Sequence, residues 1–308
     1  MKQVLLSPHA KRQDPCVLAI GNFDGVHQGH QSIARRVLEL VREGQAAIPA
    51  VMLFEPQPLE VIRPEHAPKR LMSLTEKLRQ LRAVGIEKVI VLRFNEVIRY
   101  CSPAEFVKEI LIDRLNIHAL IVGDDFRFGA HRTGDYDFLV EASRQFKFVL
   151  ERAPTYETAG ARVSSTRIRT ALTEGALLLA EQCLGRPYSI SGLVVKGDQI
   201  GRTLGIPTAN IKLHHVPPLS GVYAVEAILN SGEIMSGVAN IGSRPTVQGK
   251  ELRLETHLFK QPPNLYGSQL RVIFRHKIRD EQRFESLDVL KQAMHADIRT
   301  ARNFFNLT

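Results

Sequence analysis

The stretch CVLAIGNFDGVHQGH, residues 16–30, decides the fold of the first half of the chain. It begins with an apolar run typical of a buried strand and continues into a glycine-rich turn. Ile33, Val37 and Leu40 then recur at helical spacing, and Gly44 marks the end of that helix. The pattern predicts a strand, a tight turn and a helix in succession.

Strands and helices continue to alternate up to about residue 180. Further short apolar runs are typical of buried strands and lie at residues 48–54, 89–92 and 119–122. Ser73 with Glu76 forms a capping box that predicts a helix start between two of these runs. We therefore expect residues 1–184 to form an α/β domain, a doubly wound Rossmann-like parallel sheet covered by helices on both faces.

The pattern changes after about residue 185, where period-two alternation replaces helical spacing. Five strand-like segments lie at residues 188–195, 222–229, 234–241, 252–259 and 270–278. In the fourth, Glu255 and His257 share one face while Leu254 and Thr256 share the other. We expect residues 185–308 to form a small antiparallel β-barrel, with a terminal helix at residues 287–305 that covers the barrel.

Composition narrows the class of protein. The 308 residues suggest two domains, and the net charge of +9 is spread along the chain. A spread charge favours small anionic ligands, whereas nucleic-acid binding would be better supported by a basic cluster or stacking aromatics. No apolar run is long enough to cross a membrane, and we see no secretion signal. Three scattered cysteines indicate a reduced cytoplasmic protein without a disulfide framework.

The turn at residues 21–30 has the features of a phosphate site. It joins a strand to a helix, where backbone N–H groups point outward and the helix dipole favours anions. Gly21, Gly25 and Gly29 let phosphates approach the backbone, and His27 and His30 can donate hydrogen bonds to them. The alternative is an ordinary tight turn with incidental surface histidines.

This segment resembles the HxGH signature of the nucleotidyltransferase superfamily, and in full it is similar to the bacterial FAD synthetases. Three further elements of that family match FEPQP at residues 54–58, VGDDFRFG at 122–129 and VSSTRIR at 163–169. The family often has histidine where this chain has Gln57, which leaves open the role of a cation at that position.

The resemblance implies a set of residues for adenylyl transfer. His27 and His30 are expected to hold the ATP phosphates, together with Gly21, Phe23, Asp24, Gly25 and Gly29. A second group, expected to close from the opposite side, consists of Ser164, Ser165, Thr166 and Arg167; the alternative for these hydroxyls is helix capping. Asp124, Asp125 and Phe126 are the candidates for flavin contact; the alternative for the two acids is a solvated turn.

A second constellation, GDQIGRTLGIPTAN at residues 197–210, resembles the riboflavin kinase signature. The resemblance assigns ATP binding to Gly197, Arg202, Gly205 and Pro207. Thr208 and Asn210 offer hard oxygen ligands of the kind that suit Mg²⁺. Without the family, the loop reads equally well as a barrel turn.

The segment LETHLF at residues 254–259 also looks like this kinase family. It implies that Glu255 is the general base, although periodicity alone favours an outward-facing strand residue. Arg279, Asp280 and Glu281 are expected to contact the flavin.

Both signature sets together resemble the bifunctional riboflavin kinase/FMN adenylyltransferases. That resemblance implies a transferase using ATP and Mg²⁺ that converts riboflavin to FMN and FMN to FAD, without nucleic-acid or membrane partners. Two alternatives stay open: an enzyme with one working site, since the HxGH fold also serves cytidylyl and pantetheine-phosphate transfer, and a flavin- or nucleic-acid-binding regulator. The oligomeric state is not predicted, and a homo-oligomer is possible.

Overall fold

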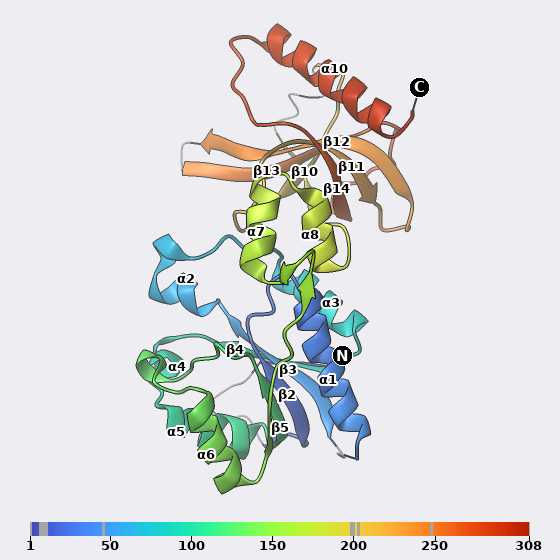
Figure 1. Cartoon of the computed structure of the whole chain (residues 1–308). Coiled ribbons are helices and arrows are strands. Elements are labelled where there is room, and N and C mark those ends of the chain that lie inside the picture. Colours follow the sequence, from blue (N-terminus) through green and yellow to red (C-terminus); the bar gives the residue numbers. More distant parts are fainter. Residues whose placement is uncertain are drawn as a thin grey trace. The chain divides into compact units, whose positions relative to one another are not determined.

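The computed structural model describes residues 2–5, 12–44, 47–197, 201, 204–246 and 249–307. The chain forms two compact units, which are described separately (Figure 1). The first consists of Met1–Pro68 and Ser73–Val163, and the second of Lys69–Met72 and Ser164–Thr308.

The first unit is built on a six-stranded sheet in the order β1-β4-β3-β2-β5-β6, and every pair of neighbours is parallel. Its strands are β1 (Lys2–Leu5), β2 (Cys16–Ile20), β3 (Ile48–Glu55), β4 (Lys88–Arg93), β5 (Ile117–Val122) and β6 (Val149–Arg152). The chain moves from β2 outward to β3 and β4, then returns to the other side of β2 with β5 and β6. The strand order therefore reverses between β2 and β5, as in doubly wound folds.

Helices cover both faces of this sheet (Figure 1). On one face lie α1 (Gln28–Arg42) and α3 (Leu74–Ala83). The other face packs against the π-helical segment η2 (Phe106–Arg114) and α6 (Tyr136–Phe146), which bury Leu18, Met52 and their neighbours. The smaller elements of this unit are α2 (Pro58–Ile62), η1 (Pro64–His66), α4 (Glu96–Tyr100), α5 (Pro103–Glu105), η3 (Ala130–Arg132), β7 (Glu157–Thr158) and β8 (Ala161–Arg162).

The second unit contains a closed six-stranded barrel in the order β10-β13-β12-β11-β14-β9, antiparallel throughout. The strands are β9 (Ser189–Val195), β10 (Ala209–Lys212), β11 (Gly221–Ile228), β12 (Ile234–Thr246), β13 (Gly249–Leu258) and β14 (Gln269–Arg279). Tyr223 and Phe274 meet edge to face, with ring centroids 5.3 Å apart. The interior is thus filled by side chains.

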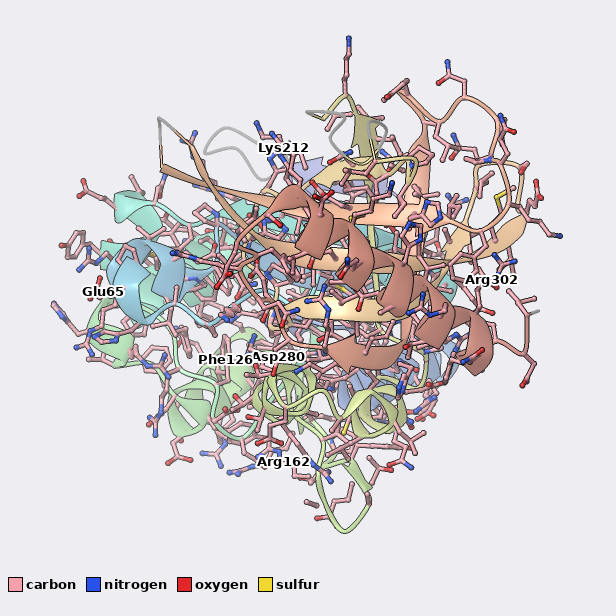
Figure 2. The ribbon with its side chains drawn as sticks, turned by 90° about the horizontal axis from the view of Figure 1, so that it is seen from above. Glu65, Phe126, Arg162, Lys212, Asp280 and Arg302 are labelled. Carbon is pink, nitrogen blue, oxygen red and sulfur yellow. The ribbon has the colours of Figure 1, made fainter. Side chains whose placement is uncertain are left out.

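The terminal helix α10 (Leu287–Phe304) lies across the outside of the barrel, with Arg302 near its end (Figure 2). Ser286 caps it by accepting a hydrogen bond from Val289 N. Ala301 is fully buried against Val222, Ala224 and Val238. Both faces of β11 are therefore covered, which explains why its first five residues are all buried.

The predicted fold class is confirmed in both halves, with local exceptions. The strands β1, β6 and β10 were not predicted, and Leu287, the first residue of the predicted terminal helix, is 61% exposed. The helices α7 (Ser165–Thr173) and α8 (Leu177–Leu184) belong to the second compact unit. The domain boundary after residue 184 stays a prediction. In the described part of the chain, no helix is long and apolar enough to cross a membrane.

Candidate active sites

Three of the motifs found in the sequence meet at one edge of the parallel sheet. The strand β2 pairs with β3 on one side and with β5 on the other. The carboxyl ends of these strands lead into residues 21–27, residues 56–58 and residues 123–126. Ligands of doubly wound folds bind at this edge, where the strand order reverses. The geometry of the first unit thus brings the HxGH turn beside the two aspartates.

The turn after β2 has an unusual backbone. Phe23 and Val26 have positive φ angles of 47° and 39°, and both side chains are buried. Such conformations cost about 1–3 kcal/mol each in residues other than glycine. Val26 N donates to Phe23 O at 3.1 Å, and the buried Lys77 donates through Nζ to Asn22 O at 2.7 Å. These contacts hold the turn in its strained form.

The two histidines are held by the helix that they open. His27 is the N-cap of α1, and its Nδ1 accepts a hydrogen bond from His30 N at 3.2 Å. In the neutral ring the proton must then lie on Nε2, which can donate to an anion. The rings of His27 and His30 stack at 3.6 Å, and the ring of Phe23 lies 4.8 Å from that of His30. The side chains of Phe23 and Asp24 are buried, so they lie on the protein side of the turn.

The residues that follow β5 and β3 differ in their exposure and contacts. Asp124 and Asp125 are exposed, and Asp124 accepts from Arg152 at 3.4 Å. Phe126 stacks on Phe128 with centroids 5.5 Å apart. Gln57 is buried, and its Nε2 has no hydrogen-bond partner within the described residues. The flavin contacts of the first three residues and the role of Gln57 stay open.

The segment at residues 164–167 begins α7, in the second compact unit. Ser164 Oγ accepts from Arg167 N at 3.2 Å, so this hydroxyl does act as a helix cap. Ser165 and Thr166 lie in the first turn, where backbone N–H groups are available to an anion. Closure of these residues over the histidines stays a prediction.

The second unit holds a cavity of about 360 Å³ between the outer face of the barrel and α10. One row of residues in register across five strands lines it: Asn210, Glu255, Asn240, Val222 and Arg279. Side chains directly opposite each other on paired strands lie about 5 Å apart. The carboxylate of Glu255 therefore stands between two amides, on a face that the terminal helix turns into a cavity wall.

One end of this row offers oxygen ligands. Asn210 Nδ2 donates to Thr208 O at 3.2 Å, which leaves Asn210 Oδ1 buried and without a hydrogen-bond partner within the described residues. A side chain at position 197 would meet the Asn210 amide at 2.7 Å, so Gly197 is required for this arrangement. Thr208 also lines the cavity. Gly205 and Pro207 belong to the adjoining turn, and the predicted Arg202 lies outside the described residues.

The other end of the row is closed by an ion pair. Arg279 donates through Nε and Nη2 to both carboxylate oxygens of Asp297 on α10, at 2.9 and 2.7 Å. Glu281 lines the cavity, whereas the carboxylate of Asp280 binds Lys277 Nζ at 2.6 Å. Of the three residues predicted to contact flavin here, Arg279 and Glu281 lie at the cavity, and Asp280 has an ion pair instead.

Comparisons with known proteins agree with this geometry. Residues 9–167 match the family model described as FAD synthetase, and residues 184–305 match the one described as riboflavin kinase. A bifunctional riboflavin kinase/FMN adenylyltransferase of Escherichia coli (strain K12) is 47% identical over 96% of this chain and 95% of its own. The chain belongs to this bifunctional family. A protein of Haemophilus influenzae with the same description is 45% identical, over 94% of each chain.

The enzyme is thus a transferase with two activities, riboflavin kinase and FMN adenylyltransferase. A crystal structure described as a macrolide-efflux protein from Streptococcus pneumoniae superposes with a TM-score of 0.81. It is 29% identical and covers 98% of this chain and 99% of its own. That likeness supports the fold found here for the whole enzyme.

Sequence reasoning did not single out several residues that line the cavity beside α10. Asn240 and Asp297 lie far from Glu255 in sequence, and only strand pairing and helix packing bring them to it. His257 shares the face of Glu255 by period two, and that signal was available. Its Nδ1 lies 2.9 Å from Pro207 O and so joins β13 to the turn that carries Thr208.

Proposed function

We propose that the cavity beside α10 is the riboflavin kinase site of the enzyme, with Glu255 as its general base. The observation that carries this is the row across the barrel, which sets the Glu255 carboxylate between Asn210 and Asn240 on the cavity wall. Val222 and Val238 supply apolar wall for a flavin ring. A cavity of mixed apolar and polar lining is typical of small-molecule sites.

In the proposed reaction Glu255 accepts the proton of the riboflavin 5′-hydroxyl. The oxygen forms a bond to the γ-phosphorus of ATP, the bond from that phosphorus to the bridging oxygen breaks, and ADP leaves. Gly201 and Leu204 on the adjoining turn, together with the half-buried Arg279, line the space in which the reactants are positioned. Because catalysis of such transfers consists of positioning and charge stabilisation, the residues fixed in register are proposed to position the reactants.

Thr208 and Asn210 fit a magnesium ion. Asn210 Oδ1 is a hard oxygen, buried and unpartnered within the described residues, and its amide is oriented by the bond to Thr208 O. When bound, Mg²⁺ neutralises phosphate charge during transfer. Magnesium usually takes one or two protein ligands together with phosphates and water, so this sparse set is sufficient.

For the adenylyltransferase site, we propose that a phosphate oxygen of FMN attacks the α-phosphorus of ATP. FAD forms as the bond to the leaving pyrophosphate breaks. No side-chain nucleophile is needed, so the protein positions the phosphates and stabilises their charge. His27, whose Nδ1 accepts from His30 N, and the stacked ring of His30 act on the phosphates. Ser164, Ser165, Thr166 and Arg167 are proposed to bind the same phosphates.

The three free cysteines support a cytoplasmic enzyme, and we propose that location. Riboflavin, FMN and ATP are the proposed small-molecule partners, and neither nucleic acid nor a membrane is proposed as one.

The test is a time course of the products formed from riboflavin, ATP and Mg²⁺, separated by chromatography. The proposal expects FMN to rise first and FAD to accumulate afterwards. Glu255→Gln should lower FMN formation by about 10²- to 10⁴-fold, while FAD still forms from added FMN. His30→Ala should abolish FAD formation and leave FMN formation intact. If either change silenced both reactions in a folded protein, the assignment of two separate sites would be wrong.

A further inference from the structure

A buried lysine lies beneath the HxGH turn and has no part in the chemistry described so far. Lys77, on α3, is 1% exposed, and its Nζ donates to the backbone oxygen of Asn22 at 2.7 Å. Lysine is almost never fully buried, because removing an ammonium group from water is costly. Lys77 is distinguished by the place of this contact, which is on the backbone of the turn itself.

The contact acts on the peptide plane between Asn22 and Phe23. In a trans peptide the carbonyl oxygen and the following N–H point in opposite directions. Drawing the Asn22 oxygen inward to Lys77 therefore turns the Phe23 N–H outward, away from the ammonium group. This N–H has no acceptor within the described residues. It is available as a donor to a phosphate at the carboxyl edge of β2.

The strain of the turn makes such a hold necessary. Phe23 has a φ of 47°, a conformation costly for a residue with a side chain, and without a fixed carbonyl the plane can rotate away. The ammonium also places a fixed positive charge on the inner side of the turn that receives the phosphates.

We propose that Lys77 is a positioning residue for adenylyl transfer: it fixes the Asn22 carbonyl and thereby aims the Phe23 N–H at the phosphates of ATP or pyrophosphate. This rests on the proposed adenylyltransferase site at the HxGH turn. Lys77 itself touches no substrate, and its effect passes through the backbone.

The chain offers a matched control in Lys88, which is 2% exposed and lies in the same unit. Lys88 is the first residue of β4, at the amino edge of the parallel sheet, whereas the HxGH turn lies at the carboxyl edge. Lys88→Met removes a buried ammonium group from the same sheet without touching the turn. It is expected to lower the thermal stability and to leave the kinetics of FAD formation within about threefold of wild type.

The test measures the reverse reaction, in which FAD and pyrophosphate give FMN and ATP, on the full chain. Lys77→Met is expected to raise the KM for pyrophosphate and to lower kcat/KM by about 10²-fold, the usual effect of losing one preorganised donor. The KM for FAD and the rate of FMN formation from riboflavin are expected to stay near wild type. If the role of Lys77 were purely structural, Lys77→Met would raise the KM for FAD as well, and Lys88→Met would have the same kinetic effects.

A KM for pyrophosphate in Lys77→Met within about threefold of the Lys88→Met value would overturn the proposal. If circular dichroism shows that Lys77→Met does not fold, Lys77→Gln is measured instead, because glutamine retains a neutral donor. Its KM for pyrophosphate and its KM for FAD are compared with those of Lys88→Met in the same way. Wild-type enzyme that forms no FAD at all would refute the proposed function of the site, and that outcome is distinct from a variant that behaves like the control.

Discussion

The ion pair between Arg279 and Asp297 joins the terminal helix to the barrel, so breaking it should loosen one wall of the kinase cavity. The side chain of Asp297 is 8% exposed and that of Arg279 is 23% exposed. Removing one partner of a fully buried pair costs about 3–5 kcal/mol, and an exposed pair contributes about 0–1 kcal/mol. Because water can reach the freed guanidinium, we expect Asp297→Ala to cost about 2–3 kcal/mol.

Hydrogen exchange of the backbone amides of α10 measures this loss locally. A cost of about 2–3 kcal/mol corresponds to exchange about 30- to 150-fold faster in α10, if the helix opens as a unit. Asp297→Asn preserves the shape and a neutral hydrogen bond, so its effect should be about 1 kcal/mol. In parallel, the KM for riboflavin should rise, because α10 supplies Leu290, Met294 and Ile298 to the cavity.

Glu226→Ala is the matched control for this prediction. Glu226 pairs with Arg275 at 2.7 Å, its side chain is 26% exposed, and neither residue lines the cavity. Its loss should weaken the contact between β11 and β14 without changing the KM for riboflavin. If amide exchange in α10 of Asp297→Ala stayed within threefold of wild type, the ion pair would not be what holds the helix to the barrel.

Three further predictions concern both units. Asn210→Ala should raise the Mg²⁺ concentration for half-maximal FMN formation by about tenfold. The unfolding free energy should change by less than about 1 kcal/mol, because the unpartnered Asn210 Oδ1 is removed together with the hydrogen bond from Asn210 Nδ2 to Thr208 O. An unchanged Mg²⁺ dependence would contradict the metal assignment. His257→Ala should raise the KM for ATP about fivefold, because losing the hydrogen bond to Pro207 O costs about 1 kcal/mol. His257→Asn keeps a donor near the Nδ1 position and should restore the KM for ATP. If both variants raised this KM equally, that hydrogen bond would be excluded as the cause. Burial raises the pKa of the Cys16 thiol from 9.0 to about 11, so the folded state holds this proton more tightly than the unfolded state. The resulting stabilisation is complete below pH 9 and is lost as the pH rises toward 11. Cys16→Ala should therefore flatten the fall of the unfolding midpoint between pH 8.5 and 10.5.

Local patterns were sufficient for most of the first unit. The capping box at Ser73 and Glu76 starts α3 as predicted, and the apolar run at residues 16–20 is a fully buried strand. These features depend on neighbours within a few residues, so a sequence pattern can report them. The missed strands β6 and β10 have four residues each, too few for a period to stand out, and they form by pairing with the neighbouring strands β5 and β13.

The candidate site residues likewise fall into those that local sequence patterns predicted and those that only the fold brings together. Motif resemblance pointed to Glu255 as a candidate, period two predicted the face it shares with His257, and the turn chemistry pointed to His27 and His30 as candidates. Asn240 was not assigned a role, because its place beside Glu255 depends on the register of two paired strands. Lys77 lies within an ordinary helical pattern, and its burial depends on a turn 55 residues away in the sequence.

By itself the sequence determined two domains of different architecture, the strand–turn–helix that carries the histidines, and the face of the carboxylate, because each depends on short-range periodicity and steric preference. Tertiary structure decided that the outer face of the barrel is a cavity wall, that Asp297 closes it through Arg279, and that the buried Lys77 contacts the backbone of the HxGH turn. Those outcomes come from packing between segments far apart in the chain, where the energy of burial and of paired charge exists only once the fold has formed.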